Sequence, residues 1–337
     1  MKIIKKRLLR TIVYHLWKRI YIAFYWKAPW AMPRIRYPRF IEIELSNACN
    51  LRCTHCHRNG MDREPGNMKL AVFKKLIDEI ETYPLVSLCI VGQGESSLNP
   101  LFSEMMQYAS GKSIKIDLTT NGAIFDRYSF EEILQWDLDV LGISVDGTDK
   151  SSYQQIRQGG NYDKLEANIR EFYAFRNKNK RKYPLILIRN VIFPEHTQQQ
   201  ITQFTETWKN SVDLINFNTL STFQETINYS WLKHCRCNEL FYEAHIRFDG
   251  DVILCQHECL YGKDQVIGNL EAESLRQIQQ SERRKERRRL HFKRDFPEVC
   301  KKCFSDKKNP EVSPNSRKYN MSRNKLVHLA NKLIDVT

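Results

Sequence analysis

The segment FIEIELSNACNLRCTHC (residues 40–56) joins a strand pattern to a cluster of cysteines. After its first residue, apolar and acidic side chains alternate, which predicts a β-strand that buries one face. Cys49, Cys53 and Cys56 follow, in the spacing C-x3-C-x2-C. In α/β proteins with parallel strands, ligands bind at the C-terminal ends of the strands. The segment therefore predicts a site built on three thiols at one edge of a sheet.

Five more strand patterns follow, and helical patterns separate them. Strands that alternate with helices predict parallel βαβ units. Six such units give an α/β fold, an open or partial (βα)6 TIM-like barrel. The predicted strands are 40–45, 85–91, 114–120, 140–145, 185–193 and 212–218. The predicted helices lie near 69–82, 100–110, 129–136, up to 180, and near 197–209.

The composition is that of a globular protein, but its positive charge is unevenly placed. The chain has 337 residues, 42% hydrophobic and 27% charged, which excludes a disordered, collagen-like or multi-span membrane protein. The net charge is +14, yet residues 1–40 carry eleven Lys and Arg and no acidic residue. A nucleic-acid-binding domain would spread such charge over a folded face. We therefore expect no nucleic-acid partner.

Residues 1–39 form a predicted N-terminal arm, in which residues 1–27 have the pattern of a basic amphipathic helix. Two interpretations of this helix remain open. It lies on an anionic membrane surface, or its apolar face packs on the body of the protein. No secretory signal pattern is present, so we expect a cytoplasmic protein. If the helix lies on a membrane, the protein is expected to be peripheral at the inner face of that membrane.

Three thiolates at this spacing can bind three irons of a cubane 4Fe–4S cluster and leave the fourth iron open to a small molecule. Cys49, Cys53 and Cys56 thus resemble the three-cysteine motif of the radical S-adenosylmethionine (SAM) superfamily. His55 stands where that family usually has an aromatic residue. A zinc site with His55 or His57 as fourth ligand is the alternative.

Three strand ends carry motifs that are similar to those of the superfamily: GQGESSLNP (92–100), TTNG (119–122) and SVDG (144–147). Gln93 replaces the usual first glycine of the family's GGE motif, and the last two motifs are also ordinary turn sequences. The resemblance identifies no catalytic residue. It implies a SAM pocket that includes Gly94, Glu95, Thr120, Asn121, Ser144 and Asp146.

A second group of cysteines follows the predicted barrel. Gly250 and Cys255 form G-x4-C, and Cys300 and Cys303 form C-x2-C. This pattern resembles the SPASM/twitch extension of radical SAM enzymes, a small Cys-rich α+β domain. The resemblance implies one auxiliary 4Fe–4S cluster, for which zinc is the alternative. Its ligands would be Cys237, Cys255, Cys300 and Cys303, with Cys235 as the alternative to Cys237.

The chain divides into four predicted parts, and two further features lie within them. The parts are the arm 1–39, the radical SAM core 40–220, the auxiliary-cluster domain 221–304 and the tail 305–337. Cys89 lies in an apolar strand and is predicted to be a buried thiol. A basic helix near 274–292 is predicted either to present a solvated face or to contact phosphate or anionic lipid.

The resemblance implies a reaction that begins with reductive cleavage of SAM. One electron, from a reductant such as flavodoxin or ferredoxin, would release a 5′-deoxyadenosyl radical that abstracts hydrogen from the substrate. The auxiliary cluster would serve in electron transfer, as in an oxidoreductase. Because the arm is too short for a leader-binding domain, we expect a carbohydrate-like or lipid-linked substrate that is oxidised or epimerised. A peptide- or protein-modifying maturase and a non-enzymatic iron–sulfur or zinc scaffold are the alternatives.

Overall fold

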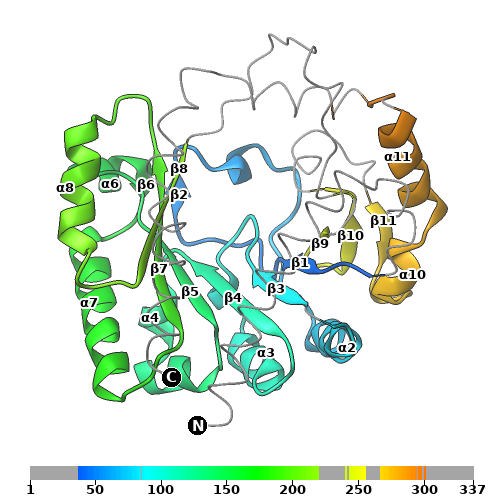
Figure 1. Cartoon of the computed structure of the whole chain (residues 1–337), viewed down its shortest axis with the longest axis horizontal. Helices are drawn as coiled ribbons and strands as arrows, with labels where there is room; N and C mark the ends of the chain where they lie inside the picture. The colour runs from blue at the N-terminus through cyan, green and yellow to red at the C-terminus, as the bar shows by residue number, and fades with distance from the viewer. Residues whose placement is uncertain are drawn as a thin grey trace, which may run out of the picture.

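The computed structural model describes residues 37–84, 86–219, 240, 243–255, 266–293, 295–297 and 300. A nine-stranded sheet runs through this part of the chain, in the order β11-β10-β9-β1-β3-β4-β5-β7-β8. The sheet curves, and helices cover its outer side (Figure 1). The predicted helix at 1–27 and the tail at 305–337 lie outside the described residues. Within the described ranges, no helix has the length and apolar character needed to cross a membrane.

Six parallel strands form the main part of the sheet and confirm the six predicted from the sequence. Each pairs in parallel with the next. Among the described strands, β8 and β11 are the two ends of the sheet, so the fold is the expected partial TIM-like barrel. The six strands are β1 (Phe40–Ile43), β3 (Ser87–Ile90), β4 (Lys115–Thr120), β5 (Val140–Ser144), β7 (Leu185–Ile192) and β8 (Leu214–Thr219).

The helices pack on the sheet through apolar stripes. They are α2 (Leu70–Glu81), α3 (Phe102–Ala109), α4 (Ile124–Arg127), α5 (Phe130–Gln135), α6 (Lys150–Ile156), α7 (Tyr162–Lys178) and α8 (Gln198–Trp208). The stripe of α2 consists of Val72, Phe73, Leu76, Ile77 and Ile80, all buried. Capping boxes begin α5, α6 and α8 at Ser129, Asp149 and Thr197, and they satisfy backbone N–H groups of the first turn.

Three further strands extend the sheet beyond β1. β9 (Glu243–Ile246) pairs in parallel with β1 and antiparallel with β10 (Asp251–Ile253), which pairs with β11 (Val266–Asn269). The turn dipeptide Asp249-Gly250 predicts a hairpin in residues 243–255. The antiparallel pairing of β9 with β10 confirms it, and Gly250 in the turn has a φ of +86°, which favours glycine. The Cys-rich segment is therefore continuous with the sheet of the core. The predicted boundary between residues 220 and 221 lies outside the described residues.

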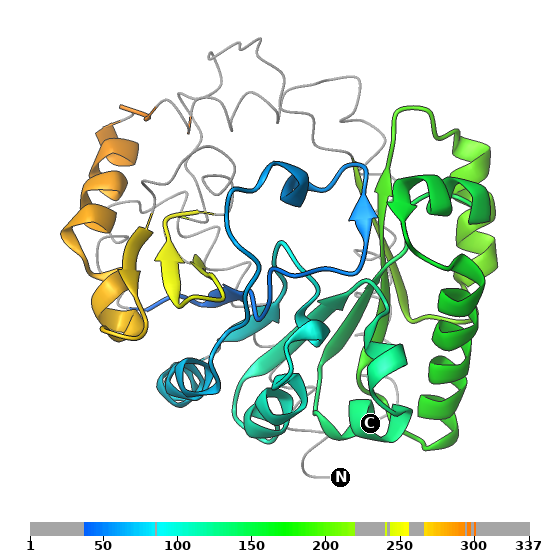
Figure 2. The same ribbon diagram turned by 180° about the vertical axis from the view of Figure 1, so that it is seen from behind.

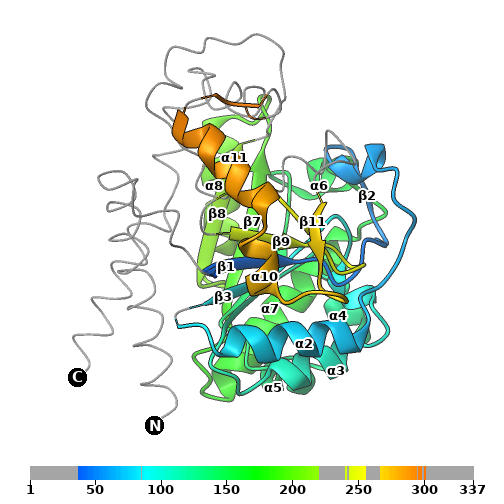
Figure 3. The ribbon, with the colours of Figure 1, turned by 90° about the vertical axis from the view of Figure 1, so that its right-hand side faces the viewer.

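The basic helix predicted near 274–292 is two helices, α10 (Leu275–Gln279) and α11 (Glu282–Lys293), which lie beside β11 (Figure 3). Arg283, Lys285 and Arg289 of α11 are exposed, as the predicted solvated face requires, but two other arginines of this helix are not. Arg284 and Arg288 are buried and donate to the backbone carbonyls of Glu243 and Leu240. These two arginines join α11 to β9 and to Leu240, because a buried carbonyl needs a donor.

Candidate active site

The three-cysteine loop crosses the C-terminal edge of the parallel strands (Figure 2). It leaves β1 and is fixed in its middle by β2 (Arg52–Cys53), which pairs antiparallel with β6 (Arg157–Gln158). Cys49, Cys53 and Cys56 are free thiols of intermediate exposure. The loop thus holds three sulfur atoms at the edge of the sheet where the sequence predicts the site.

The segment that follows β3 packs directly against this loop. A Cβ atom at Gly94 would lie 2.4 Å from the carbonyl oxygen of Ser46 and 2.5 Å from that of Ala48. The backbone N–H of Glu95 donates to Ala48 O at 2.8 Å. Only glycine allows two backbones to approach this closely. The glycine predicted for its approach to SAM therefore also positions the cysteine loop.

Glu95 is buried, and its carboxylate joins the ends of β3 and β4. Oε1 accepts hydrogen bonds from Ser97 Oγ at 2.7 Å and from Thr120 Oγ1 at 2.9 Å. Oε2 accepts from the backbone N–H of Asn121 at 2.7 Å. In this arrangement the carboxylate of Glu95 and the hydroxyl of Thr120, two predicted pocket groups, hold the TTNG turn in place.

The side chain of Asn121 reaches the cysteine loop. Its Nδ2 lies 3.6 Å from Cys49 Sγ and donates to Asn50 Oδ1 at 2.8 Å. Its Oδ1 accepts from the backbone N–H of Ala123 at 2.9 Å, which fixes the orientation of the amide. Asn121 was predicted to line the SAM pocket, and here it also contacts a predicted cluster ligand.

Asp146, predicted to belong to the SAM pocket, is buried and lies next to the cysteine loop. Its Oδ2 is 2.7 Å from Nη2 of Arg157 and 3.4 Å from Nε2 of His55. Its Oδ1 accepts from the backbone N–H of Val191 at 2.8 Å. The sequence reasoning missed Arg157, because only the pairing of β2 with β6 brings this arginine next to Cys53. Ser144, two residues earlier, is partly exposed at the end of β5.

The orientation of the His55 ring argues against the alternative in which His55 is the fourth ligand of a zinc ion. The ring points toward Asp146 and packs edge-on against Phe193, with 5.4 Å between ring centroids. Across the part of the chain that is described, no three His, Cys, Asp or Glu side chains converge as one metal ion would require. In a cubane each thiolate binds a different iron. The three separate sulfurs therefore fit a cluster better than a single zinc ion.

Burial favours the protonated form of two thiols of the loop, those of Cys49 and Cys53, until iron binds. Burial raises the pKa of the Cys49 thiol, and it raises the pKa of Cys53 to about 11 against the opposing charge of Arg157. Iron binding must then displace protons. The Arg157 guanidinium favours the thiolate form of Cys53. The site thus supplies three sulfur donors and a buried cation beside them, as an anionic cluster needs.

Glu44, which the sequence reasoning did not single out, ties the cysteine loop to the sheet. Arg63 donates to its two carboxylate oxygens at 2.8 and 3.2 Å, and the backbone N–H of Gln93 donates to Oε2 at 2.8 Å. Two residues earlier, Glu42 Oε2 lies 3.0 Å from Nδ1 of the buried His245. The alternation in FIEIEL could have indicated Glu42 and Glu44, because it puts both glutamates on the same face of β1.

Two predicted ligands of the auxiliary cluster lie in the described part of the chain. Cys255 follows β10 and Cys300 follows α11. Nε2 of His291 is 3.4 Å from Cys300 Sγ. Burial lowers the pKa of His291 to about 4, so its ring is neutral at pH 7. The predicted ligands Cys235, Cys237 and Cys303 lie outside the described residues.

Two family models match the chain. The radical SAM superfamily matches residues 43–207, and SPASM, an iron–sulfur cluster-binding domain, matches residues 235–304. Together the two matches cover most of the chain, which belongs to the radical SAM superfamily and carries a SPASM domain. The cofactors of these domains are 4Fe–4S clusters and SAM, as predicted.

Curated relatives match parts of the chain. The mycofactocin maturase MftC of Mycobacterium tuberculosis is 32% identical over 126 residues, 37% of this chain and 32% of that protein. The probable GTP 3′,8-cyclase of Methanococcus maripaludis is 29% identical over 133 residues, 39% of this chain and 44% of that protein. The chain thus aligns with less than half the length of these curated relatives.

Solved structures share the fold. SuiB of Streptococcus suis, bound to precursor peptide SuiA, has a TM-score of 0.59 at 16% identity, over 73% of this chain and 65% of that one. Native anSMEcpe, with bound AdoMet and Cp18Cys peptide, has a TM-score of 0.57 at 16% identity, over 87% of this chain and 99% of that one. At such identity the likeness establishes the fold alone.

Proposed function

We propose that the chain is a radical SAM enzyme that modifies a peptide or protein, with an auxiliary cluster in electron transfer. The observation that carries the enzyme class is the three-cysteine loop, fixed over the C-terminal edge of a parallel sheet. The names of similar proteins support a peptide substrate, since MftC is a maturase and SuiB and anSMEcpe were solved with peptides. The name of the probable GTP 3′,8-cyclase does not support a peptide substrate. The carbohydrate-like or lipid-linked substrate expected from the sequence receives less support.

In this proposal Cys49, Cys53 and Cys56 hold the cluster. Bound cluster and SAM supply a 5′-deoxyadenosyl radical once an electron arrives from a flavodoxin or ferredoxin. The residues around them position these groups. Asn121 contacts the sulfur of Cys49, and Arg157 places a positive charge beside Cys53. Contacts of this kind, between the ligands and the residues around them, orient the ligands and set the reduction potential of a cluster.

The enzyme class is tested by SAM cleavage in the anaerobically reconstituted, reduced protein. We expect wild type to release 5′-deoxyadenosine and Cys53→Ala to release at least 100-fold less, because one iron loses its ligand. Cys89→Ala is the matched control, since this buried thiol lies on β3 outside the loop and should keep the cleavage. Full cleavage by Cys53→Ala would contradict the proposed site.

The substrate class is tested by deuterium transfer. Cells that naturally contain the protein are grown in heavy water, and their extract is divided into peptide, polar-metabolite and lipid-linked fractions. A radical that takes deuterium from a substrate C–D bond becomes 5′-deoxyadenosine one mass unit heavier. We expect the heavy product with the peptide fraction and its loss after protease treatment. Protease-resistant transfer from either other fraction would refute the peptide substrate.

A further inference from the structure

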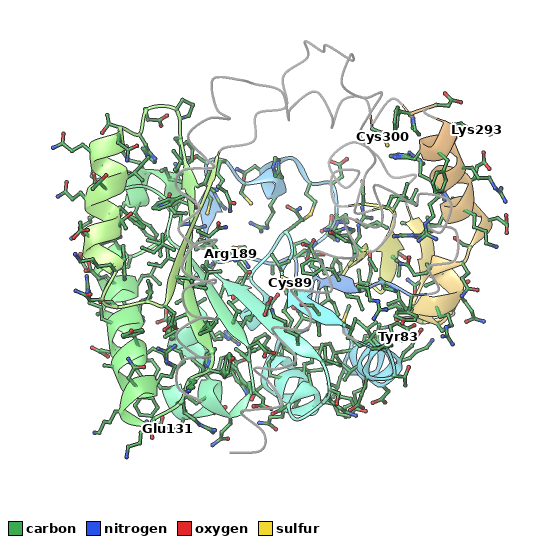
Figure 4. The ribbon with its side chains drawn as sticks, viewed as in Figure 1. Tyr83, Cys89, Glu131, Arg189, Lys293 and Cys300 are labelled. Carbon is green, nitrogen blue, oxygen red and sulfur yellow. The ribbon has the colours of Figure 1, made fainter. Side chains whose placement is uncertain are left out.

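Arg189 lies on the concave face of the barrel, in the middle of three neighbouring strands. In the parallel register it pairs with Ser144 on β5 and with Asn216 on β8, so these three polar side chains share one face of the sheet. Figure 4 shows Arg189 and Cys89 in the interior, away from the outer helices. The next residue, Asn190, faces the other way and donates to the carbonyls of Val145 and Gly147.

The side chain of Arg189 crosses β5 at a glycine. A Cβ atom at Gly142 would lie 2.7 Å from Nε and 3.4 Å from Cδ of Arg189. Any larger residue at position 142 would therefore displace the guanidinium group. Its positive charge also acts on the thiol of Cys89, on β3. The glycine thus lets the guanidinium extend toward the centre of the barrel.

Within the part of the chain that the structure describes, Arg189 has no ion-pair partner, whereas other charged groups of these strands and loops are paired. Its buried Nε has no hydrogen-bond partner, and no carboxylate within the described ranges forms an ion pair with it. Arg189 as a whole is partly exposed, but a buried N–H group without an acceptor lacks the hydrogen bond that buried polar groups normally make. The ion pairs around it are Glu42–His245, Glu44–Arg63, Lys115–Asp117 and Asp146–Arg157.

We propose that Arg189 binds a carboxylate of the peptide substrate, from an aspartate or glutamate side chain or a free C-terminus. One unpaired guanidinium matches one carboxylate, which it can bind through two parallel hydrogen bonds, whereas a phosphate monoester carries about −1.5 to −2 charges. Asn216 and Ser144 supply uncharged polar groups on the same face. This inference rests on the proposed peptide substrate.

The depth of Arg189 favours substrate over SAM as the source of the carboxylate. The cysteine loop and the TTNG and SVDG turns lie at the ends of the strands. Gly142 lies two residues before the end of β5 and pairs with Thr119 and Leu187. The guanidinium at Gly142 is therefore deeper in the barrel than the rim on which the cluster and SAM are expected. A second carboxylate-bearing molecule would occupy that level.

The first test measures carboxylate binding without knowledge of the natural substrate. Anaerobic holoenzyme is labelled with phenylglyoxal, and mass spectrometry follows the modification of Arg189. The probes are N-acetylaspartate N-methylamide, its asparagine counterpart and SAM, each alone. We expect the aspartate probe to slow the labelling of Arg189 at least three-fold and the asparagine probe to have no effect. Equal effects of the two amino-acid probes would overturn the proposal, and full protection by SAM alone would assign the carboxylate to SAM instead.

The second test uses deuterium transfer from the peptide fraction. We expect Arg189→Gln to lower the transfer at least ten-fold while SAM cleavage without substrate continues, and Arg189→Lys to recover part of it. Methyl esterification of the peptide carboxylates should give the same loss in wild type. Arg181→Gln, an exposed arginine after α7, is the control and should transfer normally.

The outcomes separate this inference from the proposed function. Undiminished transfer by Arg189→Gln, or from esterified peptides, would overturn the role of Arg189 and leave the peptide substrate standing. Absence of peptide-derived deuterium in wild type would contradict the proposed function. The phenylglyoxal result would in that case still decide whether Arg189 binds a carboxylate.

Discussion

The carboxylate of Asp146 and the guanidinium of Arg157 form a buried ion pair, with 2.7 Å between Oδ2 and Nη2. Asp146 follows β5, whereas Arg157 belongs to β6, the strand that pairs with the cysteine loop at Cys53. The pair therefore connects the barrel to the loop that carries the predicted cluster ligands. His55, inside that loop, lies 3.4 Å from the same carboxylate oxygen.

Replacement of Asp146 by Asn should destabilise the protein strongly. It leaves Arg157 buried without its anion, and breaking a buried ion pair costs about 3–5 kcal/mol. Urea denaturation of the apoprotein measures the loss. Asp126→Asn is the matched control, because Asp126 pairs with Lys164 at the surface, and such pairs contribute at most about 1 kcal/mol. A loss no larger than that of the control would show that the buried pair does not hold this region together.

Gly94→Ala should reduce cluster loading. Its Cβ would lie 2.4 Å from Ser46 O, so the cysteine loop has to move. We expect the loss of about four irons per chain, the content of one cubane cluster, in anaerobic iron and sulfide analysis. Gly60→Ala is the control, because nothing lies within 4 Å of a Cβ placed there. Equal iron content in the two variants would mean that the contact at Gly94 does not position the cluster ligands.

Tyr153 should make stability depend on pH in the alkaline range. Burial raises the pKa of Tyr153 from 10.0 to about 12. Below pH 10 the phenol is neutral in both states, whereas between pH 10 and 12 only the unfolded chain ionises, so stability falls as pH rises. This rise in the pKa corresponds to roughly 3 kcal/mol.

Tyr153→Phe removes the ionisable group and keeps the ring. Denaturation of the apoprotein at pH 9 and at pH 12 should therefore show a smaller loss of stability in the variant than in wild type. Identical losses would mean that Tyr153 has a similar pKa in the folded and the unfolded chain.

His291→Phe should make the reduction potential of the auxiliary cluster more negative. In the tautomer with the proton on Nε2, His291 donates to the sulfur of Cys300, a predicted ligand, at 3.4 Å. A hydrogen bond to a charged group contributes about 1.5 kcal/mol or more, and about 1.4 kcal/mol equals 59 mV for one electron. We therefore expect a shift of the order of 60 mV.

An EPR redox titration measures this shift. Lys293→Ala is the control, because Lys293 is exposed on the same helix, near Cys300 (Figure 4). Equal potentials in wild type and His291→Phe would show either that the ring does not donate to the sulfur or that Cys300 is not a ligand.

The local part of the fold was predictable. The alternating pattern of β1, the apolar runs of the other parallel strands and the hairpin at Gly250 each depend on neighbouring residues, and the structure confirms them. The basic segment at 274–292 was not predictable in the same way. Its composition is that of a solvated helix, but Arg284 and Arg288 are buried, and they donate hydrogen bonds to the carbonyl groups of Glu243 on β9 and of Leu240.

The sequence by itself predicted the chemistry of the candidate site. Cysteine spacing is a local property, so Cys49, Cys53 and Cys56 could be assigned to a cluster before any contact was known, and the strand ends that face them could be identified from their turns. Only the tertiary structure decided which side chains are paired there. The pairing of Asp146 with Arg157 and the position of Arg189 over Gly142 depend on the register between strands, and Glu44 meets Arg63 from the segment that follows the cysteines. That register results from packing of the whole sheet, which no short stretch of sequence encodes.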